Sequence, residues 1–351
     1  MTFDVEVVGL GLAGSTAALR LAEEGFKVAA YDPMSRYEKA CGEQVTLEPQ
    51  VEEILRRADV IKTVVRRVRV LLDGATVTEV ELRGSPKWVI IDKPVLVQAL
   101  REEARGLGVT TVRSSWFPTH EGRAITVDAR GPYAVDPLGT ILAVRLIARV
   151  RGWDPEAAWL DFRPSSGGLV WVFPYDVDGR LVNAGAGFLG VRDAIEVRYS
   201  VEAYLRERLG QVEVVDFKGA PIAAFSRPSL YSGRFFRVGE AAGLVMAWSG
   251  EGNRPAVESS LFLAEALSRA GTDDLETTRL LYSTYASNLL RMAVMSRALT
   301  LLAVSSRSSS ALMKRMPWRF WELYVRQELT PGDVVRSLAE DLSPRRSKLN
   351  L

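Results

Sequence analysis

Apolar positions at the beginning of the chain follow the pattern of a strand, a helix and a second strand. Residues 3–8 are rich in valine, residues 15–24 place alanine and leucine at helical spacing, and residues 28–31 are apolar again. A short apolar run beside glycine is typical of a buried strand, whereas a period of 3.6 residues indicates a helix. This order predicts the first unit of a parallel sheet.

Later segments alternate between hairpins and isolated strands and helices. Asp73-Gly74 and Asp178-Gly179 each stand between two runs that favour strands, which is a signature of a hairpin turn. The predicted hairpins pair 64–72 with 76–82, and 169–173 with 180–184. We also predict strands at 87–91, 124–129 and 235–238, helices at 95–107, 199–209 and 255–270, and an almost continuous helical region from residue 276 onward.

The composition excludes several classes of protein. The chain has 351 residues and a net charge of +2, so we expect no general electrostatic attraction to nucleic acid. The single cysteine, Cys41, rules out an intrachain disulfide and a Cys-rich metal site. The single histidine, His120, argues against a histidine metal cluster, and we expect it to have a structural or surface role.

The first residues contain no basic segment followed by a cleavage site, as a secretory signal would. The chain also has no uncharged apolar run of roughly 18 residues, the length that a spanning helix needs. We therefore expect a cytoplasmic protein.

The turn after the first strand carries a glycine motif, Gly9-Leu-Gly11-Leu-Ala13-Gly14. In a dinucleotide-binding unit the first glycine permits the tight turn, the second lets backbone amides approach a pyrophosphate, and the third lets the helix pack close to the strand. The helix N-terminus then offers unpaired N–H groups to phosphates. Asp32 ends the second strand, where a carboxylate can accept hydrogen bonds from ribose. We predict that these four motif residues and Asp32 bind a dinucleotide.

A second glycine-rich junction follows the predicted strand at 235–238. A carboxylate at Glu240 could bind a polyol chain such as ribityl, and amides at the start of the next helix could stabilise negative charge on a flavin. NAD alone would not need this second junction, whereas FAD extends away from the first one. The sequence therefore predicts FAD as the cofactor, with ligands in this region at Gly239, Glu240, Gly250, Gly252 and Asn253.

The two kinds of segment interleave along the chain. We predict an α/β chain (α+β overall) in which a Rossmann-like FAD-binding domain is interrupted by an antiparallel-sheet substrate domain and followed by a C-terminal helical region. The FAD-binding domain is expected at 1–45, 92–150 and 230–280, the substrate domain at 46–91 and 151–229, and the helical region at 281–351.

The order of the motifs resembles a known class of protein. Between the two glycine motifs lies Asp128-Ala-Arg-Gly131, which alone is equally typical of an ordinary turn. Together the three resemble FAD-dependent oxidoreductases with the p-hydroxybenzoate hydroxylase-like fold. Within that class the chain most resembles the geranylgeranyl reductase family, especially the archaeal enzymes that saturate isoprenoid chains of membrane lipids. The stretches that carry this closer resemblance are Ala40-Cys41-Gly42-Glu43, Trp171-Val-Phe173-Pro174 and Asn183-Ala-Gly-Ala-Gly187.

The resemblance implies a reductase that saturates C=C bonds of geranylgeranyl chains in glycerophospholipids, with hydride from N5 of the flavin. It implies that the loop of Cys41 and Gly42 faces the flavin, and that Cys41 is a candidate proton donor, since a thiol is ordinarily protonated at neutral pH. It also implies a substrate lining of Trp171, Phe173 and Pro174. From the residues alone, these aromatic side chains could equally belong to the core, and Cys41 could be a small buried residue.

Three positions depart from the family pattern. Leu169 stands where a tyrosine is usual, Glu240 where the wider class has aspartate, and Asn253-Arg254 where an aliphatic residue is common. The first departure puts the detailed shape of the substrate pocket in question. The second is conservative.

Two other functions stay open from the sequence. One is an FAD-dependent monooxygenase of the same fold, and the other is a flavin-binding protein without turnover. The electron donor is not specified either, and both ferredoxin and NAD(P)H are candidates.

The C-terminal region, residues 281–351, holds 11 basic and 5 acidic residues. Such a segment can lie on an anionic membrane surface, which would make the protein peripheral on the inner face of the membrane. It can equally form a helical cap whose aromatic side chains pack on the domain. Both interpretations stay open for the apolar residues that interleave with the charges: Leu312, Met313, Met316, Trp318, Phe320, Trp321 and Tyr324.

Overall fold

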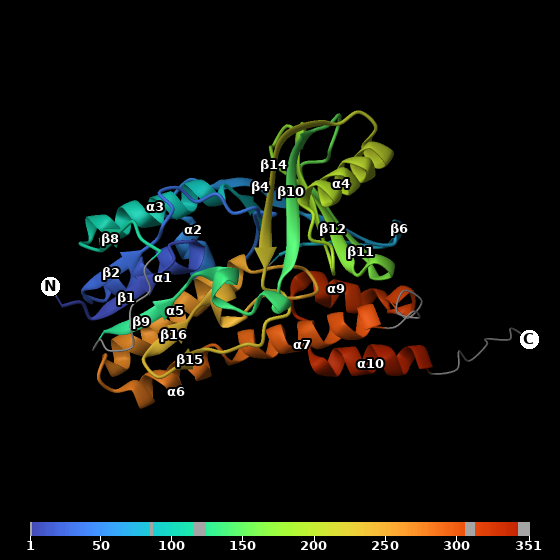
Figure 1. Cartoon of the computed structure of the whole chain (residues 1–351). Coiled ribbons are helices and arrows are strands. Elements are labelled where there is room, and N and C mark those ends of the chain that lie inside the picture. Colours follow the sequence, from blue (N-terminus) through green and yellow to red (C-terminus); the bar gives the residue numbers. More distant parts are fainter. Residues whose placement is uncertain (1, 85–86, 116–123, 306–312, 343–351) are drawn as a thin grey trace, which may run out of the picture.

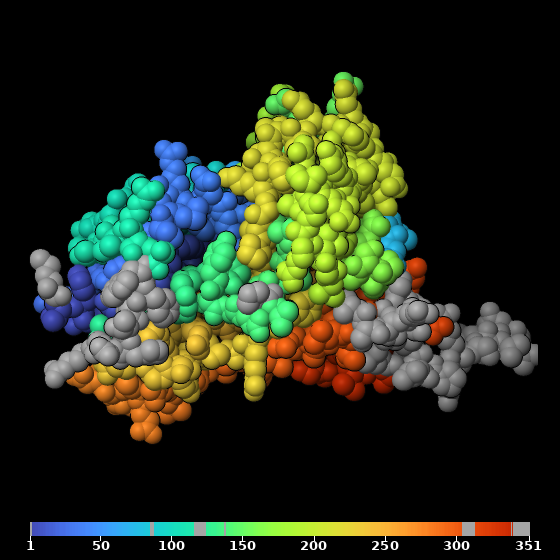
Figure 2. All heavy atoms as spheres, in the orientation of Figure 1, coloured from blue at the N-terminus to red at the C-terminus, as the bar shows by residue number. Residues whose placement is uncertain are grey.

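A computed structural model describes residues 2–84, 87–115, 124–305 and 313–342. Its elements form three regions: a sheet with helices near the N-terminus, a second and taller sheet, and a lower layer of helices that leads to the C-terminus (Figure 1). Figure 2 shows the taller sheet and its covering helix as a lobe that rises above the rest of the molecule. His120 and Leu312 lie outside the described residues.

The first region is a six-stranded sheet in the order β15-β16-β9-β1-β2-β8. All neighbouring strands pair in parallel, except β15 and β16 at the edge. Helix α1 packs against both α3 and α5 in this region. The elements are β1 (Val5–Val8), β2 (Val28–Tyr31), β8 (Thr110–Val112), β9 (Ile125–Asp128), β15 (Tyr231–Ser232), β16 (Phe235–Arg237), α1 (Leu12–Glu23), α3 (Lys93–Gly106) and α5 (Asn253–Ala270).

The predicted strand–helix–strand unit is confirmed. Val5 and Val7 on one face of β1 are fully buried and Val8 on the other face is 4% exposed, as expected for a parallel strand that is covered on both faces. Helix α1 begins at Leu12 rather than at residue 15, because Gly11 of the glycine motif is itself the N-cap. The motif therefore belongs to the first turn of the helix as well as to the loop.

The second region is a seven-stranded sheet in the order β14-β10-β13-β12-β11-β5-β6. Its neighbours pair antiparallel, except that β11 pairs with β5 in parallel. Helix α4 (Ala194–Leu209) packs against β10, β13 and β14. The strands are β5 (Arg67–Leu72), β6 (Ala75–Glu81), β10 (Ile141–Arg149), β11 (Ala157–Arg163), β12 (Gly168–Pro174), β13 (Leu181–Phe188) and β14 (Glu213–Ile222).

The strands of a smaller three-stranded sheet, in the order β3-β7-β4, alternate in the sequence with those of the two regions, since β3 and β4 follow β2 and precede β5, and β7 follows β6 and precedes α3. It contains β3 (Gln44–Leu47), β4 (Ile61–Val65) and β7 (Lys87–Ile91), with α2 (Pro49–Leu55) following β3. The predicted strand at 64–72 is therefore wrong as a single element. Arg66 separates β4 from β5, and its backbone N–H donates to the Glu156 carbonyl at 2.8 Å instead of continuing one ladder.

The structure also corrects one predicted boundary. Residues 92–150 were expected in the FAD-binding domain, but β10 is the second strand of the seven-stranded sheet and pairs with β13 and β14. The chain thus leaves the parallel sheet after β9 and enters the large sheet before residue 150.

The C-terminal helices α6 (Leu275–Tyr285), α7 (Ser287–Ser305), α9 (Trp318–Arg326) and α10 (Pro331–Leu342) form the lower layer in Figure 1. Trp321 and Tyr324 of α9 are 1% and 5% exposed and pack with Phe162 of the large sheet. No helix within the described residues is long and apolar enough to cross a membrane. Short 3₁₀ turns lie at η1 (Gly131–Ala134), η2 (Pro137–Gly139), η3 (Pro164–Ser166) and η4 (Gly239–Ala242).

Candidate functional site

The carboxyl ends of β1, β2, β9 and β16 meet at one edge of the parallel sheet, and a cavity of about 810 Å³ opens there. Ligands of open α/β sheets bind at this edge. Gly14, Gly239 and Pro174 do not line the cavity. The other predicted site residues do: Gly9, Gly11, Ala13, Asp32, Cys41, Gly42, Trp171, Phe173, Glu240, Gly250, Gly252 and Asn253.

Each of the three glycines in the first motif is needed for a different physical reason. Gly9 has φ +91°, and a Cβ there would lie 2.7 Å from the Ala129 carbonyl oxygen. A Cβ on Gly14 would lie 1.8 Å from the Gly9 carbonyl oxygen, so the helix could not pack on the turn. A Cβ on Gly11 would meet only the Tyr37 ring, at 3.5 Å. Gly11 thus leaves space on the cavity side, where the first N–H groups of α1 lack helical partners and suit a phosphate.

Asp32 lies beside this turn and is already bonded. Its carboxylate accepts hydrogen bonds from the backbone N–H of Leu10 at 2.6 Å and of Met34 at 2.7 Å. Arg101 of α3 approaches the same carboxylate at 3.4 Å and also donates to the Leu10 carbonyl oxygen. Asp32 therefore fixes the glycine turn. A carboxylate has about four lone-pair sites, so capacity for a ribose hydroxyl remains.

The two other predicted acidic positions are also engaged. Glu240 forms an ion pair with Lys39 and accepts from the Ala223 N–H at 2.8 Å. Asp128 is paired with Arg130 at 2.8 Å, which makes its turn an internally bonded one. Both carboxylates thus hold backbone segments that border the cavity.

The N-terminus of α5 faces the same cavity. Gly252 is its N-cap, and the first helical hydrogen bond runs from the Ala256 N–H to the Gly252 carbonyl. Pro255 has no N–H, so the amides of Asn253 and Arg254 are the ones left without helical partners. These amides at the positive end of a helix suit the developing negative charge of a flavin ring.

The Cys41 loop is held by residues far away in the sequence. The Cys41 Sγ lies 3.2 Å from the Glu43 N–H nitrogen, 3.5 Å from Asn253 Nδ2 and 3.7 Å from Lys93 Nζ. Asn253 Nδ2 also donates to the Gln44 carbonyl oxygen at 2.8 Å, and Lys93 Nζ donates to Asn253 Oδ1 at 2.7 Å. The side chain of Asn253, and not only its backbone N–H, therefore connects α5 to the Cys41 loop.

The segments that resemble the geranylgeranyl reductases meet at Gly42. A Cβ on Gly42 would lie 2.9 Å from a ring carbon of Phe173 and 3.3 Å from Trp171 Nε1. The indole N–H of Trp171 donates to Asn183 Oδ1 at 3.1 Å, and Asn183 Nδ2 donates to the Cys41 carbonyl oxygen at 3.0 Å. Glycine is thus required at residue 42 because two aromatic rings press on the loop.

The sequence did not single out several residues that line the cavity, among them Lys93, Arg101 and Gln327. Lys93 is only 7% exposed, although it is the first residue of α3, where a positive charge opposes the helix dipole. That unfavourable position was a signal in the sequence. Gln327 follows α9 and has φ +59°, a conformation that side chains rarely adopt. Nothing in its sequence surroundings indicated that it reaches the cavity.

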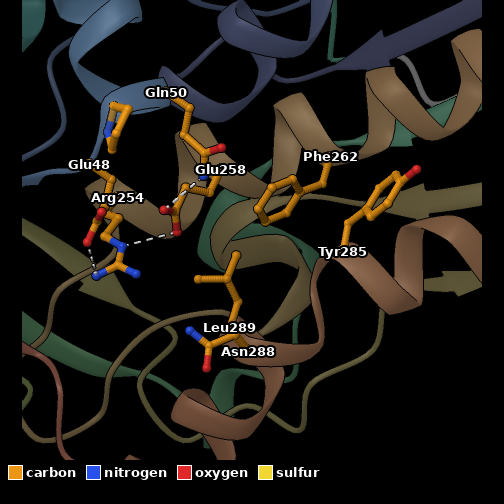
Figure 3. Close-up of a pocket in the computed structure, with 9 residues that line it drawn as sticks. Glu48, Gln50, Arg254, Glu258, Phe262, Tyr285, Asn288 and Leu289 are labelled. Carbon is orange, nitrogen blue, oxygen red and sulfur yellow. Dashed lines mark hydrogen bonds and ion pairs between the residues drawn. The ribbon is translucent and has the colours of Figure 1, made fainter.

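A smaller pocket of about 440 Å³ lies on the other side of α5 (Figure 3). Arg254 stands between Glu48 and Glu258 there, at 3.6 Å and 3.1 Å, and Gln50 donates to Glu258 at 3.1 Å. Phe262, Tyr285 and Leu289 form the apolar side of this pocket. Arg254 also donates to Gln327 Oε1 at 3.2 Å, and the amide of Gln327 donates to Glu251, so the two cavities share one buried polar network.

Glu251 of this network makes stability depend on pH. Burial raises the pKa of its carboxyl from 4.5 to about 7, and its Oε1 has no hydrogen-bond partner among the described residues. The folded chain therefore holds this proton more tightly than the unfolded chain does, and stability is lost as the pH rises through about 7. The loss amounts to about 3 kcal/mol at most. We expect Glu251→Gln to remove much of this pH-dependent loss of stability.

Thermal unfolding of both proteins at pH 5 and pH 8 measures the effect. The wild type should lose stability between the two pH values, and Glu251→Gln should lose clearly less. Glu258, whose pKa burial also raises, titrates in both proteins, and Glu251→Gln also removes the repulsion between the two carboxylates, so the comparison reports the coupled pair. Equal losses would show that Glu251 is ionised in the folded state throughout.

Comparisons with known proteins agree with this geometry. A family model for the NAD binding domain of 6-phosphogluconate dehydrogenase matches residues 4–91, of which only the part through β2 belongs to the parallel sheet. A curated relative, geranylgeranyl diphosphate reductase of Synechocystis sp., is 25% identical over 317 residues and is matched across 76% of this chain and 75% of its own length.

Solved structures show the same fold over nearly the whole chain. A geranylgeranyl bacteriochlorophyll reductase-like protein from Thermoplasma acidophilum matches with a TM-score of 0.80 and 16% identity, over 97% of this chain and 96% of its own. CtdE in complex with FAD and a substrate matches with a TM-score of 0.64 and 16% identity, over 97% and 100%. The comparisons confirm the predicted fold class and the resemblance to geranylgeranyl reductases, and one of the solved structures with this fold, CtdE, holds FAD.

Proposed function

We propose that the chain is an FAD-dependent reductase that saturates the C=C bonds of geranylgeranyl chains in membrane glycerophospholipids. A long isoprenoid chain needs an apolar wall, because the free energy of burying it scales with its apolar area. The cavity offers such a wall next to the Cys41 loop. Its apolar members are Trp88, Leu160, Trp171, Phe173, Val245 and Trp248.

One observation carries the proposal: the three segments that resemble geranylgeranyl reductases lie together at one place in the cavity. Phe173 and Trp171 cover Gly42, and Asn183 ties Trp171 to the Cys41 loop. The Cys41 loop lies more than a hundred positions from Trp171, Phe173 and Asn183 in the sequence, so its contact with them was not implied by any single motif. They form a wall of aromatic rings beside the one thiol of the chain.

The chemistry divides between the cofactor and the chain. Bound FAD supplies a hydride to one alkene carbon, and the other carbon must receive a proton. An isolated alkene is not polarised, so the acid has to stand close to that carbon in the bound state. We assign this role to Cys41. The aromatic wall orients the isoprenoid and excludes water, while the N-termini of α1 and α5 would hold the phosphates and the flavin ring.

The decisive experiment is anaerobic incubation of dithionite-reduced protein with a geranylgeranyl glycerophospholipid. Mass spectrometry of the lipid should show gains of one hydrogen molecule per double bond, together with reoxidation of the flavin. Dithionite keeps the result independent of whether ferredoxin or NAD(P)H is the natural donor. Unchanged lipid with a flavin that stays reduced contradicts the proposal.

The same experiment separates the two alternatives. A monooxygenase of this fold would leave the lipid unchanged without oxygen and would release a hydroxylated product once oxygen is admitted. A flavin-binding protein without turnover would respond to the lipid under neither condition. The aromatic wall at Cys41 favours the reductase, because it suits an apolar chain next to a proton donor.

We further propose that the outer face of α9 contacts an anionic membrane surface. Trp321 and Tyr324 pack inward, but Trp318 is 66% exposed, with the exposed basic residues Lys314, Arg315 and Arg319 beside it in the sequence. An aromatic side chain among basic ones matches a lipid headgroup layer. In this proposal the inner face of α9 is the helical cap that packs on the domain, and its outer face is the one that contacts the membrane.

Deleting the C-terminal region would not test this contact, because Tyr324 and Gln327 line the cavity. We instead expect the double variant Trp318→Ala/Arg319→Glu to bind anionic liposomes about ten-fold more weakly in co-sedimentation, since it loses an anchor and reverses a charge. Tyr199→Ala/Arg206→Glu on α4 is the matched control, with an aromatic residue that is 62% exposed and an arginine side chain that is 61% exposed. Equal binding by all three proteins contradicts the contact.

A further inference from the structure

The surroundings of the Cys41 sulfur differ from those of an ordinary buried thiol. Three donors lie around it: the Glu43 N–H, Asn253 Nδ2 and Lys93 Nζ, at 3.2, 3.5 and 3.7 Å. A neutral thiol is only a weak acceptor and gains little from them. A thiolate gains strongly, because donors that are already in place stabilise charge where it develops.

Lys93 is the charged member of this set. Its side chain is buried, and no other lysine whose side chain the structure describes is buried. Burial lowers the pKa of Lys93, but Cys41, Tyr37 and Glu240 outweigh that effect and the pKa is raised, so the side chain is an ammonium ion. Within the described residues it forms no ion pair with a carboxylate, and its hydrogen bond to Asn253 Oδ1 fixes its position.

The other charged groups around the sulfur leave this arrangement intact. From its own loop, Tyr37 lies under the Lys93 ammonium at 5.2 Å from Nζ, and Lys39 pairs with Glu240 of η4. The Glu43 side chain is buried, and burial raises the pKa of its carboxyl. Because Glu240 forms an ion pair with Lys39, its negative charge is already balanced. The positive charge of Lys93 is the one directed at Cys41.

We propose that Lys93, with Asn253 and the Glu43 amide, stabilises the thiolate that Cys41 becomes when it gives up its proton. This inference rests on the proposed function. In that step the S–H bond breaks, the proton passes to the alkene carbon that the hydride does not take, and the electron pair stays on sulfur. Reduced flavin would supply the hydride to the other alkene carbon, and solvent later returns a proton to the thiolate. Lys93 keeps its own proton throughout.

The experiment uses alkylation of the full-length protein as purified. Because Cys41 is the only cysteine, iodoacetamide adds to one site, and mass spectrometry follows the rate without any lipid. We expect Lys93→Met to slow alkylation at pH 7 about ten-fold or more, since a unit charge at this distance contributes at least that much in a partly buried site. At pH 10, above the ordinary thiol pKa of about 8.5, ionisation limits the rate less, so the difference between variant and wild type should shrink, whereas a loss of access would persist.

Two further variants complete the design. Lys93→Arg keeps a cation and should retain part of the rate at pH 7. Lys218→Met, which removes another lysine that lines the cavity, should react like the wild type. Equal rates for Lys93→Met and wild type at pH 7 overturn the inference, whatever the lipid assay shows. Slower alkylation together with a wild type that does not reduce lipid keeps the thiolate site and rejects only the proposed reaction.

Discussion

Cys41→Ala is expected to lower the rate of lipid reduction by about 10²–10⁴-fold while the protein keeps its flavin. The proton donor is lost, but the contacts that would hold FAD are made by the glycine turns and helix N-termini, and by the backbone of the loop through Asn183. The measurement is single-turnover reoxidation of the reduced flavin by the lipid, with flavin content taken from absorbance. Cys41→Ser should fall almost as far, because a hydroxyl is a far weaker acid than a thiol.

The contrary result would point to a specific replacement. Glu43 is 4% exposed, has φ +59°, and its Oε2 has no hydrogen-bond partner within the described part of the chain. Burial raises the pKa of its carboxyl, so it could carry a proton itself or hold a water. Full turnover by Cys41→Ala, lost on Glu43→Gln, would move the acid role from Cys41 to Glu43.

The parts of the site that the sequence predicted are those with local causes. Gly14 is required by its contact with the Gly9 carbonyl oxygen five residues earlier, the positive φ of Gly9 belongs to the same turn, and Asp32 ends a strand whose edge the topology dictates. Helices α1, α3, α4 and α5 were also predicted, but each prediction began after the observed first residue, and α2 was not predicted. Helix α4, for example, begins at Ala194 and not at residue 199, because its capping residue Asp193 carries no apolar periodicity.

The parts that were missed depend on contacts between distant residues. Cys41 and Asn253 are 212 positions apart, and Glu251 and Gln327 are 76 apart. Neither the hydrophobic periodicity nor the spacing of motifs in a sequence predicts contacts between residues so far apart. The placement of β10 failed for a related reason, because a largely apolar strand suits either sheet and only its partners β13 and β14 decide. The departure at Asn253 from the family pattern was visible, yet its bonds to Lys93 and the Cys41 loop needed the fold.

Gly14→Ala is expected to destabilise the protein by about 3 kcal/mol or more and to abolish flavin binding. Its Cβ would lie 1.8 Å from the Gly9 carbonyl oxygen and 3.1 Å from the Ala129 Cβ, and the nearer atom is backbone that no side-chain rotation can move. Helix α1 would have to shift away from β1, and with it the N–H groups offered to the phosphates. Thermal unfolding and the flavin content of the purified protein measure the two effects.

Gly11→Ala separates these effects and is the matched control. Its Cβ would make only an ordinary contact with the Tyr37 ring at 3.5 Å, so the stability of the flavin-free chain should change by no more than about 0.5 kcal/mol. The added methyl group nevertheless points to the cavity, where backbone amides must approach the phosphates. We therefore expect Gly11→Ala to fold normally and to bind FAD more weakly. If it bound FAD as tightly as the wild type, the phosphates would not lie over this turn, and the orientation assigned to FAD in the cavity would be wrong.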